Sequence, residues 1–170
     1  MQVSELAAIA IAIAGSVTDL RTRKIPNALT FGAAAGGFAF FLLTKGWTGL
    51  GWSAGGWLLG GLLFLPMFAL RGMGGGDVKL LAALGAWLGP SRVIWLALYT
   101  AIAGGVFALI VALSRGYARQ AFANVGSLLM FWRVAGLQPH PALTIDSATA
   151  VRLPYAIPIA AGLAVTLWLR

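Results

Sequence analysis

Residues 50–89 read LGWSAGGWLLGGLLFLPMFALRGMGGGDVKLLAALGAWLG, and this stretch decides the fold class of the chain. Two apolar runs flank a short turn that contains three consecutive glycines and the acidic residue Asp77. Apolar runs of about 20 residues are typical of helices that cross a membrane. The stretch therefore predicts two membrane helices joined by a turn that carries a carboxylate.

The composition of the whole chain also indicates a membrane protein. Of its 170 residues, 60% are hydrophobic and only 9% are charged, with a mean hydropathy of +0.90. Soluble domains carry about 25% charged residues, so this chain lacks the polar residues that a hydrated surface needs. The apolar runs are continuous rather than alternating, which disfavours a β-barrel. The absence of cysteine excludes disulfides and cysteine-ligated metal sites.

Similar apolar runs elsewhere in the chain predict an all-α, polytopic membrane protein. We expect six transmembrane helices, at residues 4–18, 28–44, 50–70, 78–89, 93–113 and 153–169. Helical apolar spacing with flanking arginines at 122–133 predicts an additional amphipathic helix at the membrane interface. The N-terminus lacks the basic region of a signal peptide, so residues 1–170 are interpreted as one membrane-embedded domain with a retained first helix.

Basic residues are divided unevenly between the two sets of loops. Nine follow the first, third and fifth predicted helices, and three lie in the opposite segments. The first group is Arg21, Arg23, Lys24, Arg71, Lys79, Arg115, Arg119, Arg133 and Arg152, and the second is Lys45, Arg92 and Arg170. Lys and Arg favour cytoplasmic loops, which places the N-terminus outside. We therefore attribute the net charge of +8 to membrane orientation and contact with anionic lipid, and not to the binding of nucleic acid.

Two carboxylates are expected on the cytoplasmic side. Asp19 follows the first predicted helix and Asp77 follows the third, so an even number of crossings separates them. Ionisable groups at membrane depth are costly and usually functional. Alone, Asp19 could pair with a neighbouring arginine, and Asp77 could cap a helix. Together they predict a pair that shares one proton and activates water against a peptide bond without a metal.

The residues around Asp77 are candidates for substrate binding or for a special turn. Gly74, Gly75 and Gly76 could adopt positive φ and let a peptide approach the bare backbone, and a flexible hinge is the alternative. The short helix that follows predicts a turn that dips into the membrane and leaves a cleft at Asp77. Lys79 cannot share a helix face with Asp77, so we expect its side chain to reach the lipid head groups.

The other polar candidates are given structural interpretations. His140 is interpreted as a solvated loop histidine, and Asp146 as a turn or cap residue. No ligand spacing supports a metal site, and no cofactor is expected. Glycine pairs four residues apart predict close helix packing. These pairs are Gly32/Gly36, Gly51/Gly55, Gly56/Gly60 and Gly85/Gly89.

The motifs resemble those of the type IV prepilin peptidases, a family of Gly-x-Gly-Asp membrane aspartyl proteases. The resemblance rests on DLRTRKIPN at 19–27, GGGDVKL at 74–80, LGP at 88–90 and LPY at 153–155. It is strongest to the small Tad/Flp-type form that has no methyltransferase domain. It implies that Asp19 and Asp77 form the catalytic dyad of a bacterial inner-membrane enzyme. It also implies that the substrate is a prepilin, whose basic cytoplasmic leader is cut off after a glycine.

Several functional interpretations remain open at this stage. The resemblance implies no N-methylation and allows contact with the pilus assembly machinery. The same protease could act on pseudopilins or preflagellins. The aspartates could instead bind a cation in a small transporter, although such carboxylates belong near the middle of the membrane. In a non-catalytic scaffold of a secretion machine, Asp77 would merely cap a helix.

Overall fold

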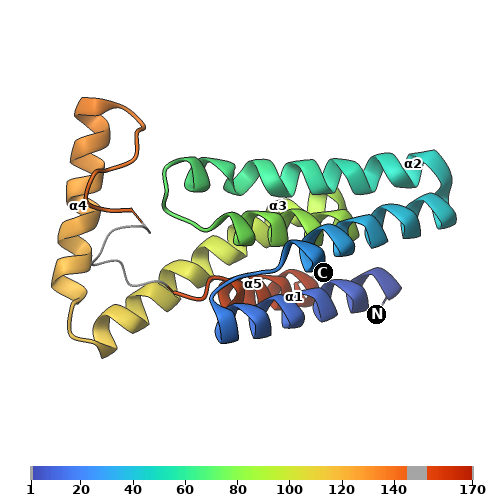
Figure 1. The fold of residues 1–170 in the computed structure, drawn as a ribbon, viewed down its shortest axis with the longest axis horizontal. Helices are drawn as coiled ribbons and strands as arrows, with labels where there is room; N and C mark the ends of the chain where they lie inside the picture. Colours follow the sequence, from blue (N-terminus) through green and yellow to red (C-terminus); the bar gives the residue numbers. More distant parts are fainter. Residues whose placement is uncertain (1, 145–152, 170) are drawn as a thin grey trace.

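The computed structural model describes residues 2–144 and 153–169, and all regular structure within them is helical (Figure 1). The five helices are α1 (Val3–Thr22), α2 (Asn27–Ala69), α3 (Gly75–Ser114), α4 (Ala118–Ala135) and α5 (Ala156–Trp168). The all-α prediction is therefore confirmed for the described residues. By length and composition, α1, α2 and α3 are suited to cross a membrane, whereas α5 is a shorter apolar helix.

Single glycines interrupt α2 and α3. Gly46 has φ 64° and ψ −153°, and Gly89 has φ 78° and ψ 175°, a region that side chains disfavour. The chain reverses direction at each glycine, so both helices are hairpins with two arms side by side (Figure 1). Across the first reversal, the rings of Phe41 and Trp52 lie 4.8 Å apart between centroids. The six apolar ranges predicted from the sequence each fall on one of these arms, on α1 or on α5.

Two predicted helix starts were wrong by one to three residues. α3 begins at Gly75, because Gly74 is its N-cap and accepts a hydrogen bond of 3.2 Å from the Asp77 N–H. Asp77 therefore lies inside the first turn and is not the N-cap residue. The N-cap of α2 is Pro26, whose extended backbone precedes Asn27.

The first arm of α3 forms the core of the bundle. Leu80, Leu81, Leu84 and Leu88 are almost completely buried, and α3 contacts all four other helices. Burial on every side requires several helices to approach one arm closely, and small residues make that approach feasible.

Glycine contacts show where this close approach occurs. The backbones of Gly56 and Gly85 touch, so that a Cβ on either would overlap the carbonyl of the other. This confirms the tight packing predicted for the pairs that contain them. A Cβ at Gly32 or at Gly51 would meet nothing within 4 Å, so in those two pairs only the second glycine lies close to another segment, as expected if some pairs arise by chance in a glycine-rich chain.

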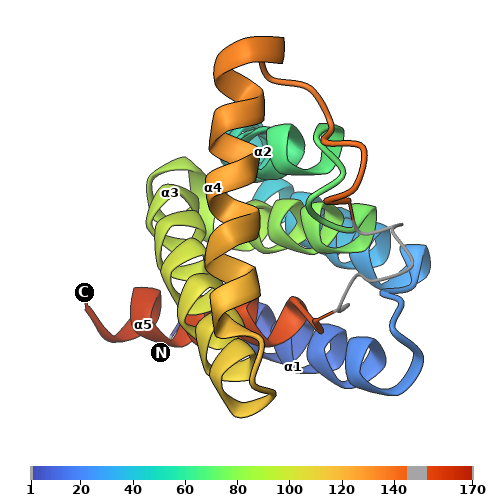
Figure 2. The same ribbon diagram turned by 90° about the vertical axis from the view of Figure 1, so that its left-hand side faces the viewer.

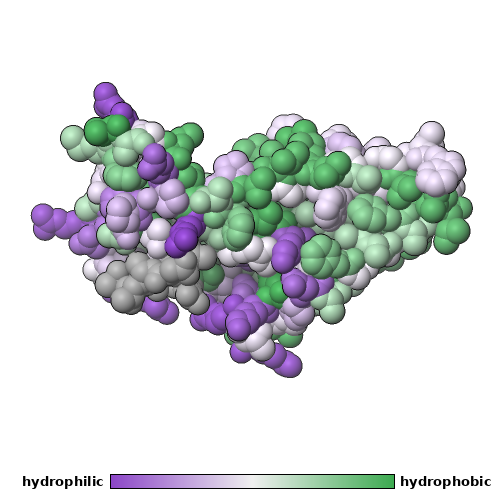
Figure 3. Space-filling model, turned by 45° about the horizontal axis from the view of Figure 1, so that its top comes forward, coloured by the Kyte–Doolittle hydropathy of each residue, from purple (hydrophilic) through white to green (hydrophobic). Residues whose placement is uncertain are grey.

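The outer surface of the bundle is apolar (Figure 3). Large hydrophobic side chains are exposed along the helices instead of being confined to the core. They include Leu6, Ile13, Leu58, Leu62, Ile102 and Ile110. Exposed apolar area of this extent is typical of contact with lipid. Hydrophilic side chains gather toward the end of the molecule that carries α4.

The two ends of the bundle differ in structure. The segments after α1, α2 and α3 lie at one end, and the reversals at Gly46 and Gly89 lie at the other (Figure 1). Figure 2 looks at the first of these ends and shows α4 crossing in front of the bundle. No residue of α4 is buried, and its Phe122, Leu129 and Met130 are exposed. The predicted amphipathic helix is therefore present, standing clear of the bundle.

Candidate functional site

Asp19 and Asp77 lie at the same end of the bundle, as the parity of the helix crossings predicts. Asp19 is in the last turn of α1 and Asp77 is in the first turn of α3. Asp19 is only 8% exposed and Asp77 is half-buried. The two carboxylates are close enough for their charges to repel each other.

The start of α5 contacts Asp19. The backbone N–H of Ala156 donates a hydrogen bond of 3.3 Å to Oδ2 of Asp19. One turn earlier on α1, the hydroxyl of Ser16 donates a hydrogen bond of 3.1 Å to the carbonyl of Ala156. Both backbone polar groups of Ala156, which is completely buried, are thus satisfied by α1.

The carboxylate of Asp77 folds back over the start of its own helix. It lies close to Gly74, the N-cap residue, where a Cβ would come within 3.1 Å of Oδ2 of Asp77. The N-terminus of a helix carries partial positive charge, which favours a carboxylate there. The hydroxyl of Tyr155, next to Ala156, lies within electrostatic range of Asp77. Adjacent residues at the start of α5 therefore face the two acids.

No cation neutralises these carboxylates within residues 2–144 and 153–169. The predicted alternative of an Asp19–arginine pair is therefore absent from this part of the chain. Lys79 contacts α2: its Nζ donates a hydrogen bond of 3.0 Å to Oδ1 of Asn27 and lies 5.5 Å from the ring centroid of Phe31. Lys79 thus ties the start of α3 to the start of α2.

The three glycines before Asp77 do not adopt the positive φ that the sequence suggested. Gly74 has φ −73° and ψ 144°, and the other two lie in the first turn of α3. Their small size matters instead, because each lies against a neighbouring group. A Cβ would come within 3.1 Å of the Asp77 carboxylate at Gly74, 3.2 Å of Phe68 at Gly75 and 3.2 Å of Ile25 at Gly76.

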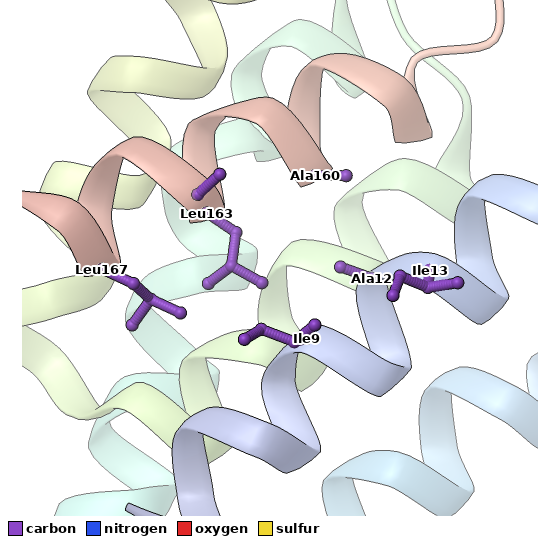
Figure 4. Close-up of a pocket in the computed structure, with 7 residues that line it drawn as sticks. Ile9, Ala12, Ile13, Ala160, Leu163 and Leu167 are labelled. Carbon is purple, nitrogen blue, oxygen red and sulfur yellow. The ribbon is translucent and has the colours of Figure 1, made fainter. Parts of the chain in front are cut away.

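A cavity of about 560 Å³ opens between α1 and α5 (Figure 4). Its lining is Ile9, Ala12, Ile13, Ala160, Leu163, Ala164 and Leu167. None of these side chains can transfer a proton or bind a charge, so the cavity offers no catalytic group. The cleft predicted beside Asp77 is a different location, and this cavity does not represent it.

His140 lies away from the two aspartates, in contact with its own segment of the chain. His140 stacks edge-on against Phe131, and its Nδ1 accepts a hydrogen bond of 3.2 Å from the Ala142 N–H. Asp146 lies outside the described residues. Within those residues, no three His, Cys, Asp or Glu side chains gather where they could hold a metal ion.

Sequence reasoning missed the contribution of α5 to the site. A signal was present, because Ser16 precedes Asp19 by three residues and therefore lies on the same face of α1. The Leu153-Pro154-Tyr155 motif supplied the resemblance, but its position beside the acids was not inferred.

Comparison with known proteins identifies the family. Residues 6–109 match the type IV leader peptidase family. The chain belongs to this family. The matched region contains both aspartates and ends within α3, so α4 and α5 lie beyond it.

Curated relatives carry the name prepilin leader peptidase/N-methyltransferase. One from Burkholderia pseudomallei (strain 1026b) is 35% identical over 104 residues, which cover 58% of this chain and 34% of the relative. One from Aeromonas salmonicida (strain A449) is 33% identical over 114 residues, covering 63% and 39%. The chain thus spans little more than a third of the length of these relatives. No solved structure matches the chain.

Proposed function

We propose that this chain is an aspartic endopeptidase that removes the leader peptide of type IV prepilins within the membrane. The observation that carries the proposal is the placement of two carboxylates, Asp19 and Asp77, at one end of the bundle (Figure 1), without a neutralising cation in the described residues. Membership of the leader peptidase family and the names of the relatives support the choice of reaction and substrate.

The chemistry follows from two carboxylates that share one proton. Like charges at close range cannot both form cheaply, so one acid stays protonated while the other is ionised. The ionised acid takes a proton from water, and the water oxygen attacks the scissile carbonyl carbon. The protonated acid donates its proton to the carbonyl oxygen. Collapse of the tetrahedral intermediate then breaks the C–N bond. The first acid passes the proton that it took from water to the leaving amine, and a hydroxyl of the intermediate returns a proton to the second acid.

The membrane arrangement is part of the proposal. α1, α5, the two arms of α2 and the two arms of α3 each cross the bilayer of a bacterial inner membrane. Residues 1–170 form one membrane-embedded domain with the N-terminus outside. The carboxylates then face the cytoplasm, because the exposed Arg21, Arg23 and Lys24 lie at their end of the bundle. α4, with its exposed apolar side chains and Arg133, lies in the interface of the cytoplasmic leaflet.

The substrate class is proposed at two levels. Prepilins follow from the names of the relatives, and Flp-type prepilins follow from the resemblance of the motifs to the small Tad/Flp-type peptidases. The same active site acting on pseudopilins or preflagellins is the second candidate. A cation-coupled transporter has less support, because both carboxylates lie at one end of the bundle. No cofactor takes part, and the pilus assembly machinery is a proposed partner.

Co-expression with a prepilin tests the proposal. Leader removal is measured by the gel mobility of the prepilin in membranes that contain wild-type protein, Asp19→Asn, Asp77→Asn or Glu5→Gln. The last variant is a matched control, because Glu5 is a buried carboxylate at the opposite end of the bundle. We expect no processing by either Asn variant at wild-type levels of inserted protein, and processing by Glu5→Gln. Full processing by either Asn variant would refute the dyad.

A further inference from the structure

α1 holds both backbone polar groups of Ala156, the first residue of α5. Asp19 accepts the hydrogen bond of its N–H and Ser16 donates to its carbonyl, over 3.3 Å and 3.1 Å. The two α1 residues are three positions apart and lie on one helix face. Ser16 therefore holds the residue whose N–H contacts the Asp19 carboxylate, through the next peptide group along the chain.

The preceding residue, Tyr155, is fixed from the other side. Its ring meets that of Phe64 edge-on, with 6.3 Å between the centroids. Its hydroxyl lies directly against Gly104 of α3, where a Cβ would overlap it. The same hydroxyl is within electrostatic range of Asp77. The turn at Tyr155 and Ala156 is thus held to α3, the helix of Asp77, at Gly104, and to α1 at Asp19 itself.

We propose that the Tyr155 and Ala156 turn sets the separation of the two carboxylates, and that Ser16 is a positioning residue for the cleavage reaction. This inference rests on the proposed function, since it concerns the same pair of acids. It adds a segment to the site that lies beyond residues 6–109, the part that matches the family. Ser16 acts through Ala156 and does not touch the reacting atoms.

Loss of the Ser16 hydroxyl has a definite consequence. The carbonyl of Ala156 keeps its bond within α5 but loses its bond to α1, and of the two hydrogen bonds between α1 and Ala156 only the one to Asp19 remains. Displacement of a catalytic group by about 1 Å is enough to slow a reaction strongly. The turn does not bind substrate in this scheme, so the rate of the chemical step falls while substrate affinity stays the same.

Kinetics of three variants at α1 test the role of Ser16. Processing of a purified prepilin in detergent gives kcat and KM per folded enzyme. We expect Ser16→Ala to lower kcat by about five- to tenfold with KM unchanged, and Ser16→Thr to restore most of it. Thr18→Val is the matched control and should behave as wild type, because the Thr18 hydroxyl bonds only to carbonyls of Ala14 and Gly15 on its own helix.

Adjacent glycines on α3 test the role of Tyr155. Gly104→Ala pushes a methyl group against the Tyr155 hydroxyl, and we expect a fall in kcat of about tenfold. Gly105→Ala is the control, because a Cβ there meets nothing within 4 Å. Both changes place the same methyl group in the same helix.

The outcomes separate this inference from the proposed function. Wild-type kcat in Ser16→Ala, a Thr18→Val variant as slow as Ser16→Ala, or no rescue by Ser16→Thr would overturn the positioning role. Equal kinetics of Gly104→Ala and Gly105→Ala would overturn the role of Tyr155. In each case an inactive Asp19→Asn leaves the proposed peptidase standing, whereas an active Asp19→Asn removes the proposed function itself.

Discussion

Both ends of the bundle hold a buried carboxylate, and their surroundings are opposite. At the end with the glycine reversals, Glu5 is completely buried and its Oε1 lies 3.0 Å from Nη1 of Arg92. At the other end, Asp19 accepts a hydrogen bond from a backbone N–H and shares its end of the bundle with a second acid, Asp77, and neither pairs with a cation among residues 2–144 and 153–169. Glu5 joins α1 to the second arm of α3, as a structural ion pair does.

The contrast fits a structural role for Glu5 and the catalytic role proposed for Asp19 and Asp77. Burial of a charge is costly unless an opposite charge compensates it. Arg92 provides this compensation for Glu5, and the pair holds two helices together. In the proposed mechanism, Asp19 and Asp77 lower this cost by sharing a proton, which leaves one acid and one base in the same place.

The strongest test of this contrast replaces each of the two aspartates by asparagine. Asp19→Asn and Asp77→Asn should each lower the rate of leader removal by about a thousandfold or more. Their melting temperature in detergent should be unchanged or higher, because repulsion between the acids disappears. If activity falls only in proportion to a lower melting temperature, the two aspartates serve stability, as Glu5 does, and not catalysis.

Breaking the ion pair should have the opposite signature. Arg92→Gln leaves Glu5 buried beside no guanidinium, and we expect the free energy of unfolding to fall by about 3 kcal/mol, less any part screened at the half-exposed arginine. Leader removal per folded enzyme should stay at the wild-type value. The double variant Arg92→Gln with Glu5→Gln should regain stability; if it is less stable than Arg92→Gln alone, the pairing is not what stabilises the bundle.

Crowding the glycines before Asp77 should have an intermediate effect. In Gly75→Val the new side chain meets the Phe68 ring, which lies 3.2 Å from the position of its Cβ. We expect about tenfold slower cleavage because the first turn of α3 is displaced. Gly51→Val, in the arm after Gly46, meets nothing within 4 Å and is the control for the added bulk. Equal cleavage rates for Gly75→Val and Gly51→Val would show that crowding beside Phe68 does not slow the reaction.

The smallest effect is expected for the lysine near the acids. Lys79→Gln loses the bond to Asn27, and the free energy of unfolding should fall by less than about 1 kcal/mol because the pair is exposed. Leader removal should change by less than about twofold. A large loss of cleavage would show that Lys79 acts on Asp77 or on the substrate.

Much of the architecture follows from local patterns in the sequence. Continuous apolar runs predict the helical arms, and the parity of these runs predicts that Asp19 and Asp77 share an end. Both inferences depend on counting along the chain and need no knowledge of how the helices are rotated.

Contacts between distant segments could not be inferred in this way. The bond from Ala156 to Asp19 and the pair of Arg92 with Glu5 depend on the rotation and vertical offset of packed helices. The same is true of the glycine pairs, since identical spacing gives contact at Gly56 and open space at Gly32. The start of α3 was misplaced because three glycines look like a breaker, although they fit the first turn of a helix.

The reversals at Gly46 and Gly89 consume almost no chain. If the arms span the bilayer, the far face exposes little more than two tight corners, the N-terminal end of α1 and the C-terminal end of α5 (Figure 1). Reporter tags, antibodies or soluble proteases would then find almost everything they can reach, including α4 and the connecting segments, on one side only. An enzyme built in this way meets its soluble partners from a single compartment.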